Sequence, residues 1–357
     1  MRGLRFVQLS ILVSPLGECG PARALPVRFE PAPPATKPKK DASEDEKKLF
    51  RQEKKKAALT RVGVAVIQSV RQQLDQRPDT IQRQLIVAVD GSYTNRTVLK
   101  ERLDRTTLIG RIRKDAKLLH PLPSDDLSKR SGRPRRYGPL APTPEQVLKD
   151  DSIPFQKVSA FAAGQVREFP VKIVKPRYWR NAGVDLPLQL VVVKPVGYRL
   201  RKGSKLLYRS PAFLICTDTN LAIEILLQAY IDRWEIECNH RDEKSFIGVA
   251  QGQVRNPLAA ARLPQFQVAG YSILLLASLL AHGFQRSADF LPLPKWRGKS
   301  VRPSILDILN LLRQQMFGHH FDRQGEDSFD GFDDIRPIAM KSQKLSFSAK
   351  SLSTYAA

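Results

Sequence analysis

The chain has few of the residues that build cross-linked or metal-clustered small proteins. Its 357 residues include three cysteines, Cys19, Cys216 and Cys238, and no two of them stand in a C-x-x-C arrangement. This spacing supports neither a disulfide framework nor a zinc knuckle. The scarcity of thiols fits a reducing cytoplasm.

The sequence also lacks a hydrophobic run long enough to span a membrane. The longest apolar stretch, 268–281, contains Tyr271 and Ser272 and is shorter than the roughly 20 residues that a membrane span needs. It predicts a buried helix and no membrane partner. The first 24 residues weakly resemble a signal peptide, but their short apolar segment is equally typical of a strand. A secreted protein of another class, with a processed N-terminus, is therefore one alternative.

Acidic residues are scarce relative to basic ones. The 59 lysines and arginines exceed the 35 aspartates and glutamates, which gives a formal charge of +24, and residues 1–40 contain no aspartate. This balance points to a polyanionic partner, with nucleic acid as the first candidate, although it also fits a membrane surface or plain solvation. The 42% hydrophobic content is enough for a packed core.

The order of the expected elements indicates an α/β fold. Two strands at 5–13 and 23–29 precede a helical stretch at 42–76, a buried strand at 85–89, a helix at 94–105 and a strand at 106–113. A basic loop rich in glycine and proline then leads to β-type runs at 169–174, 188–193 and 212–216. Helical patterns return at 221–246 and 259–284.

These elements divide the chain into four segments. Residues 1–120 are expected to form the N-terminal part of an α/β core, and 121–217 a β-rich insertion with basic loops. Residues 218–286 supply the C-terminal helices of the core. The region 287–357 follows, and its last twenty or so residues, rich in Ser and Lys, are expected to be disordered.

The strongest motif lies in LLQAYIDRWEIECNHRDEKSFIG, where Tyr230, Arg233, Glu237 and Lys244 form a Y-x2-R-x3-E-x6-K pattern. At about 100° per residue, their offsets place all four on one face of a helix. A carboxylate suits a hard metal ion, and the two cations suit DNA phosphates. The alternative interpretation is a solvated helix with ordinary charge pairs.

This spacing, followed by Gly248, resembles the C-terminal signature of bacterial insertion-sequence transposases of the DDE, ribonuclease H-like class. The resemblance covers most of residues 1–285, and it implies that Glu237 is the third catalytic acid. Asp90, in LIVAVDGSYTN with Tyr93, resembles the second aspartate of that family. An Asx-turn after a buried strand is the structural alternative for Asp90.

The resemblance implies a ribonuclease H-like mixed sheet flanked by helices, with a β-rich insertion between the second aspartate and the glutamate helix. It further implies two-metal phosphoryl transfer with Mg²⁺ or Mn²⁺ on Asp90 and Glu237. Tyr230, Arg233 and Lys244 are then the supporting, phosphate-binding residues. The expected partners are transposon ends and target DNA, with a homodimer on DNA.

One acid that the resemblance requires is missing. The family's first aspartate lies on a central strand ahead of the two N-terminal strands, whereas Asp41 and Asp45 belong to the charged stretch beyond them. We therefore expect an N-terminally truncated chain without its first central strand, with impaired or no cleavage and poor stability. A non-catalytic DNA-binding remnant is the alternative. Asp218 is a candidate substitute acid, although its position just before the next helix favours capping of that helix together with Asn220.

Several further residues have two interpretations each. His240 is able to face the site or to make an ordinary polar contact, and His319–His320 has no partner at metal-ligand spacing. Trp234 is expected to pack in the core rather than stack on bases. The basic loops SKRSGRPRRYG and YRLRKGSKLLYR fit either DNA contact or plain solvation.

Overall fold

The two N-terminal strand patterns form a hairpin, as predicted. The computed structural model describes residues 4–15, 20–123, 135–183, 186–198, 203–293, 302–317 and 354–356. Within these, β1 (Phe6–Val13) and β2 (Arg23–Pro31) pair in antiparallel fashion, with an irregularity between Leu9 and Ser10. The N-terminal apolar segment is therefore a strand of the fold.

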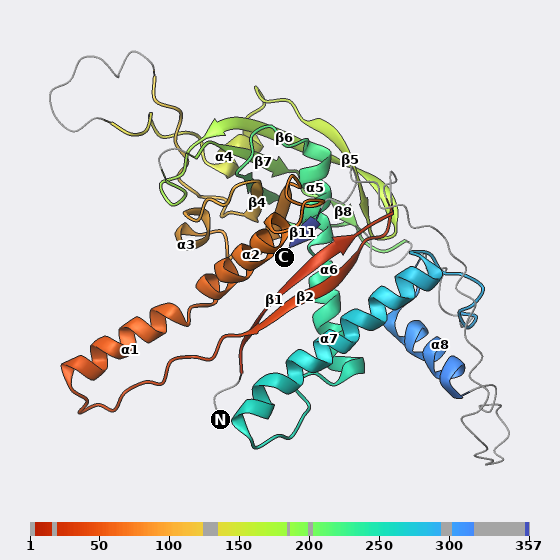
Figure 1. The fold of residues 1–357 in the computed structure, drawn as a ribbon. Helices are drawn as coiled ribbons and strands as arrows, with labels where there is room; N and C mark the ends of the chain where they lie inside the picture. Colours follow the sequence, from red (N-terminus) through yellow and green to blue (C-terminus); the bar gives the residue numbers. More distant parts are fainter. Residues whose placement is uncertain are drawn as a thin grey trace.

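The expected helical stretch at 42–76 is divided into two helices. α1 (Glu44–Lys56) begins with a capping box between Ser43 and Glu46 and buries no residue. It projects away from the rest of the chain (Figure 1). α2 (Leu59–Asp75) buries the apolar face that its periodicity predicts, because Val66, Ile67 and Val70 all lie in the core.

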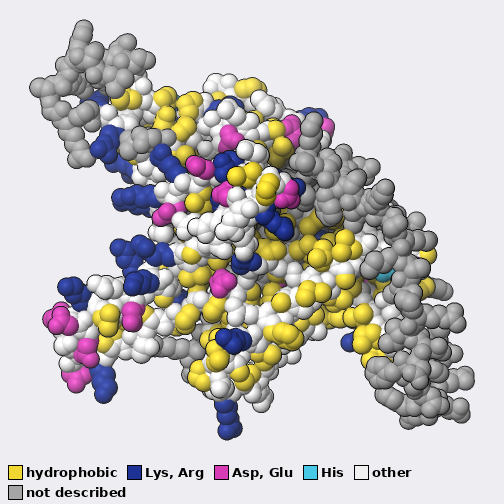
Figure 2. Space-filling view, viewed as in Figure 1, with side chains coloured by type: hydrophobic (Ala, Val, Ile, Leu, Met, Phe, Trp, Pro, Cys, Tyr) yellow, Lys and Arg dark blue, Asp and Glu magenta, His cyan; other side chains and the backbone are white. Residues whose placement is uncertain are grey.

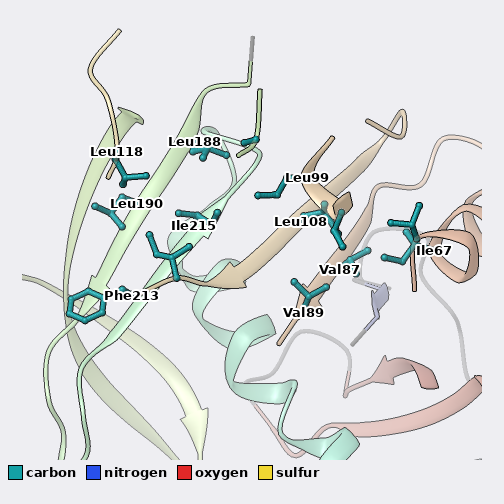
Figure 3. Packing of buried hydrophobic residues seen from close by; sticks show 14 of the residues in the cluster. Ile67, Val87, Val89, Leu99, Leu108, Leu118, Leu188, Leu190, Phe213 and Ile215 are labelled. Carbon is teal, nitrogen blue, oxygen red and sulfur yellow. The ribbon is translucent and has the colours of Figure 1, made fainter. Parts of the chain in front are cut away.

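The run Leu85–Val89 is strand β3, and all five of its residues are buried. Alternate side chains enter different layers, as the period of a strand requires. Leu85, Val87 and Val89 pack with α2, whereas Ile86 packs with the helix that follows the insertion. Figure 3 shows Val87 and Val89 in the first of these layers, with Ile67 of α2 nearby.

The helix expected at 94–105 is much shorter than predicted. α3 (Arg96–Leu99) has a single turn, capped by the Asn95 side chain, which accepts hydrogen bonds from the Thr97 and Val98 amides. The chain then leaves the helix and enters β4 (Thr106–Arg111), which pairs in parallel with β3.

The segment expected as an insertion is rich in strands, and it extends the core sheet. It contains α4 (Pro144–Lys149), β5 (Gln156–Ala162), β6 (Gln165–Arg177), β7 (Leu188–Val193), β8 (Gly197–Tyr198), β9 (Leu207–Tyr208) and β10 (Ala212–Cys216). The sheet order is β11-β3-β4-β10-β7-β6-β5, and β8–β9 pair separately. The result is a curled mixed sheet flanked by helices (Figure 1), consistent with the expected ribonuclease H-like fold.

Strand β11 (Thr354–Ala356) lies beside β3 and pairs with it in parallel from Leu85 to Val87. It also approaches β1. The N-terminal hairpin is therefore not hydrogen-bonded to β3 but is separated from it by this short strand. The prediction of disorder for the last twenty or so residues does not hold for β11, and the rest of that stretch lies outside the described residues.

The helix expected at 221–246 is interrupted at Arg233 and Trp234. It consists of α5 (Ile223–Asp232), α6 (Glu235–Asp242) and a π-helical turn, η2 (Glu243–Ile247), which ends at Gly248 with φ of 79°. The four signature residues therefore do not share one regular helix. The one-face geometry predicted from a continuous period of 3.6 residues does not hold as far as Lys244.

Two helices complete the described fold, α7 (Pro257–His282) and α8 (Ile305–Phe317). Tyr271, Leu275 and Leu279 bury one side of α7, as expected of a core helix. Its other side is exposed, with Phe266 77% and Ile273 67% accessible, so the expectation of a buried helix was half wrong. Among the described helices, α7 alone has the length and composition of a membrane span.

Candidate active site

Asp90 follows the carboxyl end of β3 and lies in a hydrogen-bonded turn. The Tyr93 amide donates to the Asp90 carbonyl at 2.9 Å, and the Ser92 hydroxyl donates to its carboxylate at 3.1 Å. The Asx-turn interpretation is thus correct, and it is compatible with a site at a strand end. Burial raises the pKa of Asp90, but hydrogen bonds from Gly91 and Ser92 and the charge of Arg233 outweigh that effect and lower it. The carboxyl is therefore ionised at neutral pH.

Glu237 lies in the first turn of α6, just after the interruption that separates α5 from α6. Its carboxylate accepts a hydrogen bond from the Arg233 guanidinium at 3.1 Å, and the two side chains form an ion pair. The Glu237 side chain is 40% exposed, whereas that of Arg233 is 16% exposed. The arginine is thus held in the wall of the site, and the glutamate is open to solvent.

The two acids line one cavity. It has a volume of about 350 Å³, and Asp90, Tyr93, Arg233, Glu237 and His240 form its polar wall. Gln8 of β1 is a further polar lining residue, and the rest are Gly63 and apolar residues of β1, α2, β3 and α6. The structure therefore brings together the aspartate after β3 and the glutamate of α6, from two segments far apart in the chain.

Tyr230 belongs to the same cluster. The Arg233 guanidinium lies 5.8 Å from the centre of its ring. Burial raises the pKa of the Tyr230 phenol, and the charges of Arg111, Arg233, Asp90 and Glu237 all act on it. Sequence reasoning missed Arg111, which is the last residue of β4; its position at the end of the strand paired with β3 was the available signal.

Lys244 is not part of this cluster. It lies in the π-helical turn and is exposed. With the described residues, its amino group makes no hydrogen bond or ion pair, and only its carbonyl is used, by Gln251 at 2.9 Å. The structure therefore joins Tyr230, Arg233 and Glu237 but leaves Lys244 on the surface.

Asp218 lies away from Asp90. Thr217 exchanges hydrogen bonds with Leu108, whereas Asp90 follows Val89, which pairs with Gly110. Because β10 runs antiparallel to β4, the chain at Asp218 has moved toward the amino ends of β3 and β4. Its carboxylate accepts from the Asn220 amide at 2.8 Å, but α5 begins only after Ala222, so Asp218 closes a turn and does not cap the helix.

The remaining predicted residues have mixed outcomes. His240 lines the cavity, and its Nδ1 lies 3.4 Å from the buried Glu243 carboxylate. The prediction that Trp234 packs in the core was wrong, because 59% of its surface is exposed. Asp45 lies on the outlying helix α1. His319–His320 and parts of both basic loops lie outside the described residues.

A buried polar network behind α6 fixes the helix that carries Glu237. The Asn239 amide donates to the Ala24 carbonyl at 2.9 Å and accepts from the Tyr271 hydroxyl at 3.1 Å. Arg302 forms two hydrogen bonds with Glu235. No local pattern in the sequence pointed to these contacts, because their partners lie on distant segments.

The donor set of the cavity fits one divalent ion. Asp90 is ionised and Glu237 is open to solvent, and a Mg²⁺ ion in a protein is commonly held by one or two carboxylates, with water and phosphate completing its shell. Among the described residues no group of three or more His, Cys, Asp or Glu is placed to hold a metal. The described side chains of the cavity therefore offer ligands for one ion and too few carboxylates for a second.

Comparison with known families agrees with this fold. Residues 7–167 match the family model described as DDE superfamily endonuclease. The match includes Asp90 but ends within β6, before Glu237, and it covers less than half of the chain. It supports a DDE-type transposase or nuclease family, whose members act on DNA and generally use divalent metals. No curated protein matches the chain.

Proposed function

We propose that the protein binds DNA and uses Asp90 and Glu237 for DDE-type phosphoryl transfer, the strand cleavage and strand transfer that occur at the ends of an insertion sequence. The observation that carries this proposal is the shared cavity, in which an ionised aspartate after β3 meets a solvent-accessible glutamate of α6. As a DNA-acting bacterial protein it is expected in the cytoplasm.

Each residue of the cluster has a role that follows from its chemistry. Asp90 and Glu237 would hold Mg²⁺ or Mn²⁺, which would activate an attacking oxygen and stabilise the leaving one. Arg233 lies between the acids, where its guanidinium is able to shift from Glu237 to a DNA phosphate. Tyr230 packs against Arg233 and orients it, while Lys244 contacts phosphate at the periphery.

We further propose that catalysis by this chain is impaired. Two-metal phosphoryl transfer requires enough carboxylates for two ions, and the cavity offers two acidic side chains. The first aspartate that the resemblance requires, on a central strand ahead of β1 and β2, has no counterpart among the described residues that line this cavity. A DNA-binding protein without cleavage is therefore the second candidate function, favoured by this incomplete acid set.

A combined binding and cleavage assay tests both candidates. The wild type, Glu237→Gln and the control Glu224→Gln, an exposed acid of α5, are incubated with linear duplex DNA and Mn²⁺ at rising salt. All three should bind DNA with an affinity that falls as salt rises. Any weak cleavage should disappear only in Glu237→Gln.

Three outcomes contradict parts of the proposal. Absence of salt-dependent binding contradicts the DNA partner. Metal-dependent cleavage that survives Glu237→Gln contradicts the site. Rapid cleavage that Glu237→Gln abolishes supports the site but contradicts the claim of impaired catalysis.

A further inference from the structure

The exposed side of α7 carries a regular apolar stripe. Its large members are Phe266, Ile273, Leu276 and Leu280, which are 77%, 67%, 45% and 50% exposed. Together with Ala269 they repeat at intervals of three and four residues, the spacing of a coiled-coil seam. Figure 2 shows hydrophobic side chains gathered over α7 on this face of the molecule. We call these five residues the α7 seam.

The orientation of the seam is fixed, because the opposite side of α7 is hydrogen-bonded to strand β2. The Gln265 amide donates to the Phe29 carbonyl at 3.0 Å, and the Ser272 hydroxyl donates to the Pro26 carbonyl at 2.7 Å. Tyr271 is buried and donates to Asn239. These contacts fix the rotation of the helix, so the seam faces away from the chain that carries it.

The seam is complementary to itself about Ile273. In an antiparallel pair of α7 helices related by a two-fold axis at Ile273, Phe266 of one copy meets Leu280 of the other. Leu276 meets Gly270, where the structure has no atom within 4 Å of a Cβ position. A large side chain thus lies over an empty glycine surface, which is the fit that a symmetric interface needs.

Charge does not oppose this pairing at the seam itself. From Leu263 to Ala281 the chain has no Asp, Glu, Lys or Arg, so no like charges meet across the axis. The rest of the molecule does oppose it, since each copy carries a formal charge of +24. Added salt screens such repulsion and should therefore strengthen the dimer.

We infer that the α7 seam is the surface through which two copies of this chain associate, by antiparallel packing about Ile273. The inference goes beyond the proposed function and uses none of its acids. One helix face buries less than a standard interface of roughly 800 Å² per partner. The dimer is accordingly weak, with a dissociation constant on the order of micromolar.

Sedimentation of the full chain without DNA tests this surface. The variants are Ile273→Glu, Ile273→Lys and the control Leu49→Glu, which alters a 56% exposed leucine of α1. The wild type and the control should dimerise, more strongly at higher salt. Each Ile273 variant should raise the dissociation constant about tenfold or more. An equimolar mixture of Ile273→Glu and Ile273→Lys should regain the dimer, because opposite charges then meet at the axis.

Failure of the mixture to associate, or undiminished association of either single variant, overturns the inference. A monomeric wild type that binds vesicles of phosphatidylglycerol, with binding lost in Ile273→Glu, assigns the seam to a lipid surface instead and also overturns it. Urea unfolding of each variant shows that the chain is folded. Because no DNA or metal is present, these outcomes are independent of the phosphoryl-transfer proposal.

Discussion

Asp90 and Glu237 line the same cavity, yet the structure holds them in different ways. Asp90 follows a strand whose five residues are all buried between two apolar layers. Glu237 lies just after the interruption between two short helices, where one ion pair with Arg233 and the polar contacts of neighbouring residues hold it. One acid is thus positioned by apolar packing and the other by polar contacts.

This difference predicts how strongly substitutions around Asp90 and around Glu237 change the free energy of unfolding. Apolar packing in β3 is shared by many contacts, so damage there should unfold the protein. The polar contacts around α6 are few and depend on charge, so damage there should alter ion binding and pH dependence before it alters the fold. Four tests of this contrast follow, taken from the largest expected effect to the smallest.

Val87→Asp places a carboxylate at a position of β3 that is 1% exposed. An unpaired buried charge costs about 4 kcal/mol or more, so the free energy of unfolding should fall by that amount or folding should fail. The matched change on the other side, Trp234→Asp, alters a 59% exposed residue and should cost less than about 1 kcal/mol. Urea denaturation followed by circular dichroism measures both. Equal losses would show that the two sides are not held differently.

Gly110→Ala tests the packing beside the Asp90 turn. A Cβ at this position of β4 would lie 2.2 Å from the Thr94 hydroxyl oxygen and 3.1 Å from its Cβ, so Thr94 must move. Overpacking of this kind costs about 1–3 kcal/mol. The control is Gly91→Ala, whose nearest neighbour would lie at 3.6 Å and which should change stability by no more than about 0.5 kcal/mol. A neutral Gly110→Ala in thermal unfolding contradicts the close packing.

Asp232→Asn tests the helical side through pH. Burial raises the pKa of Asp232 from 3.8 to about 7, and the Gln228 amide donates to it at 2.8 Å. A folded-state pKa above the unfolded value means that the folded chain binds a proton between about pH 4 and pH 7, so stability falls as pH rises through that range. The variant should be more stable than the wild type at pH 8, where the buried carboxyl of the wild type is charged, and this advantage should vanish near pH 4. A difference independent of pH contradicts the burial of an acid there.

Arg233→Ala and Lys244→Ala separate the two cations of the signature. Arg233 lies beside both acids, so its removal should increase the affinity of the site for Mn²⁺ by about threefold to tenfold. Lys244 makes no ion pair with the described residues, and its removal should leave Mn²⁺ affinity unchanged. Isothermal titration calorimetry makes the comparison. An equal effect of the two substitutions would mean that the signature acts as one helix face after all.

Most elements around Asp90 were predictable from the sequence, because each is encoded by a pattern of neighbouring residues. The continuous apolar run of β3 is typical of a strand buried on both faces, and it ends at the acid itself. The strands β1, β2, β4, β7 and β10 were predicted for the same reason. Each signal lay within about ten residues of the element that it predicted.

The Glu237 side was predictable only in its residue types. The signature named Tyr230, Arg233 and Glu237, but a regular period gave no sign of the interruption between α5 and α6 or of the π-helical turn. The contacts that hold α6, such as Arg302 with Glu235, join distant segments, and no local pattern predicts such a pair.

The most direct test of the account is the binding of Mn²⁺, measured by calorimetry on the wild type, Asp90→Asn, Glu237→Gln and the control Asp218→Asn. The account predicts one strong site per chain, a loss of affinity of about tenfold or more in each of the first two variants, and no change in the control. Mn²⁺ binding that persists unchanged in both Asp90→Asn and Glu237→Gln would contradict the claim that these two acids form a single metal-binding active site.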